Sequence, residues 1–301
     1  MNLPSLVNRA PSQLSPILSN YLLKWRQDQL LVTKNPSQTE MLPSFEAYLR
    51  LVACIDRSPV KLVRLSSTFG EREISLWANA CSQAGKAVFL QVPNTATLPK
   101  KQAGFSWRLK RAFDLVLATL LLLLLGPVLL TIALIIRLDS PGPILFQQWR
   151  VGERGKLFRI FKFRTMIVGA EALHHQVMGN QSGLHKHTND PRLTSIGRWL
   201  RKYSLDELPQ LFNVLRGEMS LVGPRPWALY DAVRISPDMR QRLNALPGIT
   251  GSWQVTSRSN LLDLNAVNRH DLDYLSSWSL WQDIKILLMT LPKVISGFGA
   301  Y

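Results

Sequence analysis

The sequence predicts an α+β membrane-associated domain with a proline-broken re-entrant membrane helix and interfacial helices, preceded by a small α/β N-terminal domain. Three observations support this fold class. Residues 115–136 are uncharged and almost entirely apolar, the pattern of a membrane helix. Before this run, β-type and helical patterns alternate, and after it come two strand patterns and a basic amphipathic helix.

The N-terminal part of the chain alternates short apolar runs with helical stretches. Strand patterns lie at residues 29–33, 60–66 and 87–92, and helical patterns at residues 41–55 and 71–84. This order is typical of a parallel sheet with crossover helices. It contains no glycine-rich phosphate loop. We therefore expect residues 1–96 to form a small α/β module of unknown role, joined to the rest by a linker at residues 97–109.

A proline interrupts the apolar run at its centre, at Gly126-Pro127. Proline removes a backbone hydrogen bond and kinks or breaks a helix. Each half then measures about 11 residues, or roughly 17 Å, enough to enter one leaflet and return. Cations lie at both ends, Lys110 and Arg111 before the run and Arg137 after it, and favour the cytoplasmic side. Residues 110–138 are therefore predicted to form a re-entrant hairpin, with a kinked spanning helix as the alternative.

Two strand patterns follow the membrane run, at residues 146–151 and 157–165, joined by a glycine-bearing turn. Lys162 and Arg164 are two residues apart in the second strand and so share one face. Two fixed cations on one face can hold a phosphate. A solvated strand face is the alternative explanation of this pair.

The acidic pair Asp206-Glu207 stands out in a chain with 36 Lys and Arg residues against 20 Asp and Glu, a net charge of +16. Ser204 and Glu207 have the spacing of a helix capping box. Pro209 conflicts with that register, so a second possibility is a helix that begins near Leu208 with the pair on its approach.

The net positive charge of the chain predicts a polyanionic partner: nucleic acid, an anionic membrane surface or a phosphorylated substrate.

Two more basic features follow the pattern of anion or membrane contact. The segment around Arg201 interleaves cations with Trp199 and Tyr203 at helical spacing, as in helices that lie in a membrane interface. A helix packed on a protein core is the alternative, and the neighbouring apolar run favours the interface. Arg225 lies between two prolines, which restrict its backbone. A rigidly placed guanidinium suits a bidentate contact with phosphate.

Residues 108–301 resemble the bacterial sugar transferase family, the monotopic phosphoglycosyl transferases that begin assembly of exopolysaccharide and O-antigen repeat units. The matching segments are KRAFD at residues 110–114, SPGPILFQQWRVGERGKLFRIFKFRTM at 140–166, NDPRLTSIGRWLRKYSLDELPQLFNVLRGEMSLVGPRP at 189–226, PGITGSWQV at 247–255 and DLDYLSSWSLWQDIKILLMT at 271–290. Their order and spacing match over most of the chain after the linker.

The resemblance implies a reaction and a location. Residues 139–301 would form a sugar-phosphate transferase domain at the cytoplasmic face of the bacterial inner membrane. This domain would move a sugar 1-phosphate from a UDP-sugar to undecaprenyl phosphate and release UMP. Asp206 would be the nucleophile that forms a covalent phosphosugar intermediate. Glu207 would support the site by positioning, by proton transfer or, together with Asp206, by binding Mg²⁺ or Mn²⁺.

The resemblance also assigns the remaining site residues and partners. Because a carboxylate approaching a diphosphate meets like charge, cations must neutralise the phosphates. The candidates are Lys162, Arg164, Arg192, Arg201, Arg225 and Arg258. The hairpin residues are Lys110, Arg111, Asp114, Gly126 and Pro127. Expected partners besides the two substrates are the lipid membrane, downstream glycosyltransferases and a second copy of the chain.

The sequence departs from the family pattern near Arg258, where Ser257 replaces the glycine usual in the family. This departure leaves the identity of the sugar open. It also keeps a second interpretation, a catalytically weak membrane scaffold of a polysaccharide assembly complex. A nucleic-acid-binding protein, suggested by charge alone, gives the apolar hairpin no role, so no nucleic-acid partner is expected.

Overall fold

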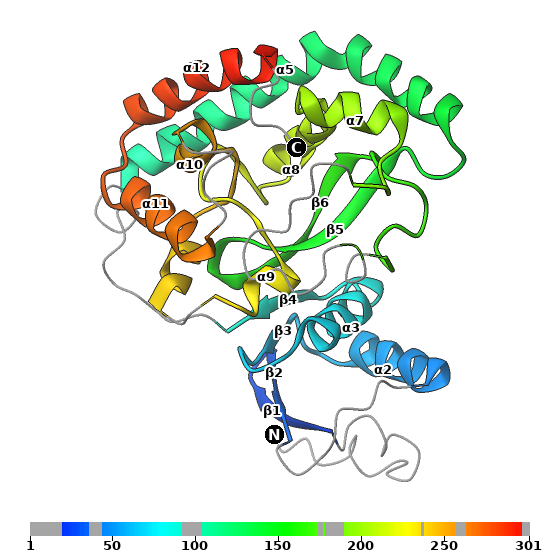
Figure 1. The fold of residues 1–301 in the computed structure, drawn as a ribbon. Coiled ribbons are helices and arrows are strands. Elements are labelled where there is room, and N and C mark those ends of the chain that lie inside the picture. Colours follow the sequence, from blue (N-terminus) through cyan, green and yellow to red (C-terminus); the bar gives the residue numbers. More distant parts are fainter. Residues whose placement is uncertain are drawn as a thin grey trace. The chain divides into compact units, whose positions relative to one another are not determined.

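The computed structural model describes residues 20–35, 44–91, 104–173, 177, 190–235, 238–256 and 263–296. The chain divides into two compact units. Unit 1 comprises Met1–Val92, Arg154–Leu157 and Ala228–Arg234, and unit 2 comprises Pro93–Glu153, Phe158–Trp227 and Ile235–Tyr301. Figure 1 shows the elements coloured along the sequence.

Unit 1 is built on a four-stranded sheet of order β1-β2-β3-β4. Its elements are β1 (Tyr21–Arg26), β2 (Gln29–Lys34), α2 (Phe45–Arg57), β3 (Leu62–Leu65), α3 (Glu71–Gln83) and β4 (Ala87–Leu90). β2, β3 and β4 pair in parallel, and Val63 of β3 lies opposite Leu30 on one side and Val88 on the other. The predicted β-α-β-α-β order is confirmed. β1, which pairs antiparallel with β2, was not predicted.

Large apolar side chains fill the core of unit 1. Val63, Leu65 and Trp77 are completely buried. Tyr21 of β1 meets the indole of Trp77 edge to face, with ring centroids 5.4 Å apart. β1 therefore adds an aromatic side chain to the core as well as an edge to the sheet.

One long helix, α5 (Gly104–Asp139, 36 residues), opens the described part of unit 2. It stays helical through Gly126 and Pro127, so the predicted break of the helix is not confirmed. Thr131 donates its hydroxyl to the carbonyl of Pro127 at 2.9 Å. Among the described residues, α5 is the one helix long and apolar enough to cross a membrane. Only 17% of its most apolar window is buried, unlike the core helix of a soluble protein.

The strands of unit 2 form small sheets. β5 (Leu145–Val151) and β6 (Leu157–Phe163) are the two predicted strands, and they form a sheet of order β6-β5-β8 with β8 (Trp227–Ala228). β7 (Ser220–Val222) pairs in parallel with β9 (Gly248–Thr250). The helices of unit 2 after β6 are α7 (Ser195–Lys202), α8 (Gln210–Leu215), α10 (Ser252–Thr256), α11 (Leu264–Ser276) and α12 (Leu280–Ser296). The short helix α9 (Leu229–Ala232) belongs to unit 1.

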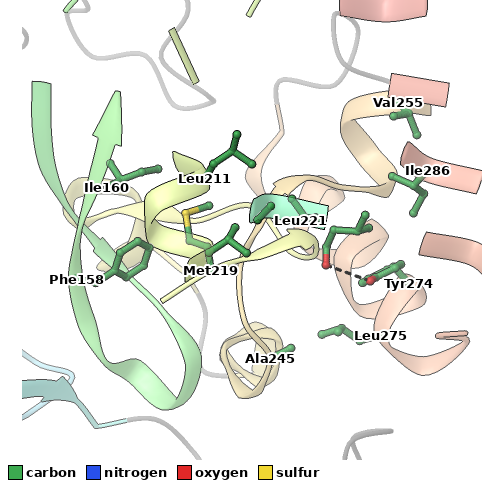
Figure 2. Packing of buried hydrophobic residues seen from close by; sticks show 13 residues of the cluster. Phe158, Ile160, Leu211, Met219, Leu221, Ala245, Val255, Tyr274, Leu275 and Ile286 are labelled. Atoms are coloured by element: carbon green, nitrogen blue, oxygen red, sulfur yellow. Dashed lines mark hydrogen bonds between the residues drawn. The ribbon is translucent and has the colours of Figure 1, made fainter. Parts of the chain in front are cut away.

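Two apolar clusters hold α5 on unit 2. The first, shown in Figure 2, joins β6, α8, β7, α11 and α12 through side chains such as Phe158, Leu211 and Ile286, and it includes Ala118 of α5. The dashed line in Figure 2 marks the hydrogen bond from the Tyr274 hydroxyl to the carbonyl of Val222. The second cluster packs Ile132 and Ile136 of α5 against Phe163 and Leu200. Both halves of α5 are thus packed on the same unit.

Candidate active site

The acidic pair lies in a short 3₁₀ turn, Leu205–Glu207, just before α8. Ser204 has a left-handed backbone (φ 55°) and its side chain makes no cap hydrogen bond. The predicted capping box is therefore wrong. Pro209 is the N-cap of α8, and the helix begins after it because proline is poorly accommodated further inside a helix. The other register, with the pair on the approach to the helix, is confirmed.

Asp206 is a buried carboxylate, with 7% of its surface exposed. Burial raises its pKa to about 6, because the charged form loses water. Lys162 lowers this pKa, the neighbouring Glu207 raises it, and Arg201 lowers it. The Asp206 carboxyl therefore changes between its protonated and ionised forms near pH 6. Such a raised pKa is common in groups with a chemical role.

Glu207 forms an ion pair with Lys162 of β6, with 2.7 Å between Nζ and Oε1. Asn213 of α8 fixes the position of this helix against β6. Its side chain accepts a hydrogen bond from the backbone N–H of Phe161 and donates to the carbonyl of Arg159. Lys162 is the next residue along β6, so the strand presents it toward the turn that carries the acidic pair.

Arg201 reaches the same region from α7. Its Nε donates to the Thr165 hydroxyl at 3.0 Å. This contact requires α7 to lie very close to the end of β6, and Gly197 permits it, since a Cβ on Gly197 would collide with the carbonyl of Thr165. The structure therefore brings together Asp206, Glu207, Lys162 and Arg201.

Two of the other predicted cations are buried and have partners within the chain. Arg164 donates to the carbonyls of Pro141, Ser140 and Ile136, at the end of α5 and in the turn that follows it. Arg192 forms an ion pair with Asp190 at 2.6 Å. In this arrangement Arg164 connects β6 to α5, and Arg192 neutralises a buried carboxylate.

Arg225 lies in a second cluster. Its guanidinium stands over the ring of Trp253, 5.2 Å from the centroid. Its backbone N–H donates to Asp271 of α11, and its carbonyl accepts from Arg242. Arg258 lies outside the described residues.

The predicted hairpin residues at the start of α5 form a buried polar network. Lys110 lies 2.7 Å from Asp283 of α12 and 3.7 Å from Asp114. Asp114 accepts from the Ser220 hydroxyl at 2.7 Å. Arg111 donates to the carbonyls of Val214 and Met219. These charges fix the beginning of α5 to unit 2.

The chain offers Asp206 and Glu207 as oxygen ligands for a divalent cation. No group of three metal-binding side chains occurs among the described residues. Mg²⁺ is commonly held by one or two carboxylates together with substrate phosphates. Two adjacent carboxylates therefore fit a cation that is bound with a diphosphate.

Sequence reasoning missed Arg242, Asp271 and Trp253. Asp271 is the first residue of the segment 271–290 that matches the family, and Trp253 lies in the matching segment 247–255. The sequence pattern offered no reason to assign a role to either residue. Arg242 lies in no recognised segment, and its partner is 29 residues away.

A family model described as bacterial sugar transferase matches residues 105–297, more than half of the chain. The chain is 43% identical over 197 residues to a galactosyl transferase CpsE of Streptococcus agalactiae, covering 64% of this chain and 43% of the relative. It is 42% identical over 224 residues to an undecaprenyl-phosphate glucose phosphotransferase of Komagataeibacter xylinus, covering 69% of this chain and 40% of the relative.

A shorter relative matches over more of its own length. This is a UDP-glucose:undecaprenyl-phosphate glucose-1-phosphate transferase of Caulobacter vibrioides, 45% identical over 200 residues that cover 64% of this chain and 72% of the relative. The chain spans less than half the length of the first two relatives.

Proposed function

Because the chain belongs to the bacterial sugar transferase family, we propose that it transfers a sugar 1-phosphate from a UDP-sugar to undecaprenyl phosphate. The observation that carries this proposal is the buried Asp206, whose pKa is about 6 and which lies next to Glu207, Lys162 and Arg201. The names of two relatives, an undecaprenyl-phosphate glucose phosphotransferase and a UDP-glucose:undecaprenyl-phosphate glucose-1-phosphate transferase, support the substrate classes.

In the proposed reaction, a carboxylate oxygen of Asp206 attacks the phosphorus that bears the sugar. A new oxygen–phosphorus bond forms, the bond to the uridylyl phosphate breaks, and UMP leaves. An oxygen of undecaprenyl phosphate then attacks the same phosphorus and frees the Asp206 carboxylate. The covalent step divides one difficult transfer into two.

Charge neutralisation is what this site has to supply. A carboxylate and a phosphate oxygen repel each other by roughly 4 kcal/mol at 4 Å in an environment of effective dielectric 20. Lys162 and Arg201 are the cations that act electrostatically on Asp206, and they are placed to offset this repulsion. Lys162 is paired with Glu207, so binding of a diphosphate would give its ammonium a second anionic partner.

Mg²⁺ or Mn²⁺, bound with the diphosphate by Asp206 and Glu207, would neutralise negative charge on the transferred phosphate. Lys162 pairs with Glu207 within the turn that carries both carboxylates. The raised pKa of Asp206 leaves its carboxyl partly protonated near pH 6.

The acceptor lipid requires attachment to a membrane, and we propose that α5 enters the cytoplasmic leaflet of the inner membrane and returns. The support is the spacing of its two packed ends. Ala118 and Ile132 are both buried in clusters of unit 2, and the 14 helical steps from one to the other span roughly 21 Å of straight helix. A hydrocarbon core of about 30 Å cannot be crossed by that length.

One face of the segment between these positions exposes large apolar side chains. Leu120, Leu123, Leu124 and Leu130 have 57–74% of their surface accessible. Their exposure is the expected property of a segment covered by lipid. Anchoring the protein in the leaflet that holds undecaprenyl phosphate also lowers the entropy cost of their encounter.

Membranes that contain the protein, incubated with a panel of radiolabelled UDP-sugars, test the proposed reaction. We expect label in the lipid extract with one UDP-hexose and none with the Asp206→Asn variant. If Asp206→Asn makes no product but restores polysaccharide production in cells, the scaffold role is favoured instead. Product formation by Asp206→Asn at the wild-type rate would refute the assigned nucleophile.

A further inference from the structure

Arg225 is held through its backbone by two buried charged residues from different elements. Asp271 of α11 accepts the Arg225 N–H, and Arg242 of the 3₁₀ turn Asp238–Asn244 donates to the Arg225 carbonyl. Arg242 and Asp271 are also bonded to each other, through the same carboxylate oxygen that accepts from Arg225. Both hydrogen-bonding groups of one peptide residue are therefore engaged by one ion pair.

The ion pair is completely enclosed. Arg242 and Asp271 each have 1% of their surface exposed. Arg242 also lies over the ring of Trp227, 4.9 Å from its centroid, and the Trp227 indole donates to Asn268 of α11. Burying an ion pair usually stabilises a fold little, because desolvation offsets the attraction. This pair binds the N–H and the carbonyl of Arg225. Its most direct effect is therefore to fix the position of the Arg225 backbone.

The guanidinium of Arg225 has a different environment from its backbone. Arg225 as a whole is partly exposed, and its guanidinium lies against Trp253. Among the contacts described for this residue, both hydrogen bonds involve the backbone N–H and carbonyl. The planar fork of an arginine matches phosphate oxygens when its direction is fixed.

We propose that Arg242 and Asp271 are positioning residues that hold Arg225 for the diphosphate of the nucleotide-sugar donor. This inference rests on the proposed function for its donor, but it concerns how the binding group is held. Pro224 and Pro226 restrict the φ angles on either side, and the ion pair fixes the N–H and carbonyl between them. The side chain of Arg225 is then attached to a backbone with little conformational freedom, and its guanidinium packs on the ring of Trp253.

The test removes the hydrogen bonds without leaving a buried charge. Replacement of a buried ion pair by apolar residues of similar size is often neutral for stability, so we use the double variant Arg242→Met/Asp271→Leu in the full chain in detergent. UDP serves as the probe, and its affinity is measured by calorimetry in the wild type, the double variant, Arg225→Gln and the combination. The melting temperature is recorded for each.

Positioning predicts that the double variant and Arg225→Gln each weaken UDP binding by about tenfold, the equivalent of roughly 1.4 kcal/mol. Arg225→Gln should add nothing further in the double-variant background. Asp271→Asn, whose amide oxygen can still accept both hydrogen bonds, leaves the charge of buried Arg242 uncompensated, so it should lower the melting temperature yet bind UDP nearly as well as the wild type. If the double variant does not fold, Arg242→Lys, which keeps the charge beside Asp271, should show a smaller loss that also disappears with Arg225→Gln.

Tyr274→Phe is the matched control. Tyr274 lies one turn further along α11 and its buried hydroxyl donates to Asp283 at 2.6 Å, so the variant loses a buried hydrogen bond without touching Arg225. It should lower the melting temperature and leave the affinity for UDP unchanged.

Other outcomes separate this inference from the proposed function. Unchanged UDP affinity in the double variant, or a full Arg225→Gln loss in its background, would overturn the positioning role even if the wild type transfers phosphosugar. A second outcome is that the variants change UDP affinity in the predicted non-additive way, while the wild type transfers no sugar from any UDP-sugar of the panel. That result would support the positioning role and refute the proposed reaction. A wild type that fails to bind UDP would refute both.

Discussion

The ammonium of Lys162 lies 2.7 Å from a carboxylate oxygen of Glu207, the residue next to Asp206. This pair joins β6 to the turn before α8 and places a cation beside a buried carboxylate. Lys162 is thus the side chain through which the strand acts on the acidic pair.

Replacing Lys162 with Met should raise the pKa of Asp206. The nearby ammonium lowers this pKa, which is about 6 in the wild type, and its removal leaves the effects of burial and Glu207 less opposed. The rate of the first transfer needs ionised Asp206, so its pH midpoint should move above 6. Single-turnover release of UMP between pH 5 and 8 measures this. Lys162→Arg should keep the midpoint, and an unmoved midpoint in Lys162→Met would contradict the electrostatic role.

Asp206→Asn should stabilise the protein more at pH 8 than at pH 5. The carboxyl ionises at 3.8 when unperturbed and at about 6 in the folded chain. The folded state therefore holds the proton more tightly, and this contribution to stability is lost as pH rises through about 6. Asparagine carries no such cost, so its advantage should reach about 1 to 3 kcal/mol at pH 8. Melting curves at the two pH values test this. An advantage that is the same at both would show that Asp206 ionises normally.

Arg164→Met should destabilise unit 2 by about 2 kcal/mol, because the carbonyls of Pro141 and Ser140 lose a charged donor in a partly buried place. Gly142 has a φ of 124°, and a Cβ there would meet the Arg164 guanidinium, so the turn is shaped around this side chain. Urea unfolding of the full chain measures the loss, with the exposed Arg198→Met as control. Normal stability with lost donor binding would instead make Arg164 a phosphate ligand.

Cysteines at positions 105 and 145 should be labelled from the same, cytoplasmic, side of the membrane in intact cells. The reason is that both halves of α5 are packed on unit 2. Cys54 is exposed and Cys81 buried, so both are replaced before the new cysteines are introduced. A membrane-permeant maleimide should label both sites, and an impermeant one neither. Labelling of just one site by the impermeant reagent would establish a spanning helix.

Local patterns predicted much of this structure. The parallel strands of unit 1 and the β5–β6 pair follow from runs of apolar and β-branched residues, which determine strands locally. Pro209 likewise indicated where α8 could begin. The Ser204–Glu207 spacing indicated a capping box that the structure does not form. The left-handed backbone of Ser204 depends on how the chain leaves α7, which the spacing alone does not determine.

The partners of the cations could not be predicted, because they are distant in the sequence. Arg164 meets Ser140 and Pro141 across more than twenty residues, and Lys110 meets Asp283 across 173. Sequence spacing indicated that arginines of this region could bind phosphate. Whether a guanidinium donates to backbone carbonyls or stands over an aromatic ring is decided by packing, as the contrast between Arg164 and Arg225 shows.

The covalent intermediate on Asp206 is the most direct test of the account. The purified full chain is incubated with the UDP-sugar that it uses, without lipid acceptor, then acid-quenched, digested and analysed by mass spectrometry. We predict that the peptide containing Asp206 gains the mass of a sugar phosphate in the wild type and gains none in Asp206→Asn. Addition of undecaprenyl phosphate before the quench should remove it. Transfer to lipid at the wild-type rate by Asp206→Asn, or a sugar phosphate attached to another residue, would contradict the account.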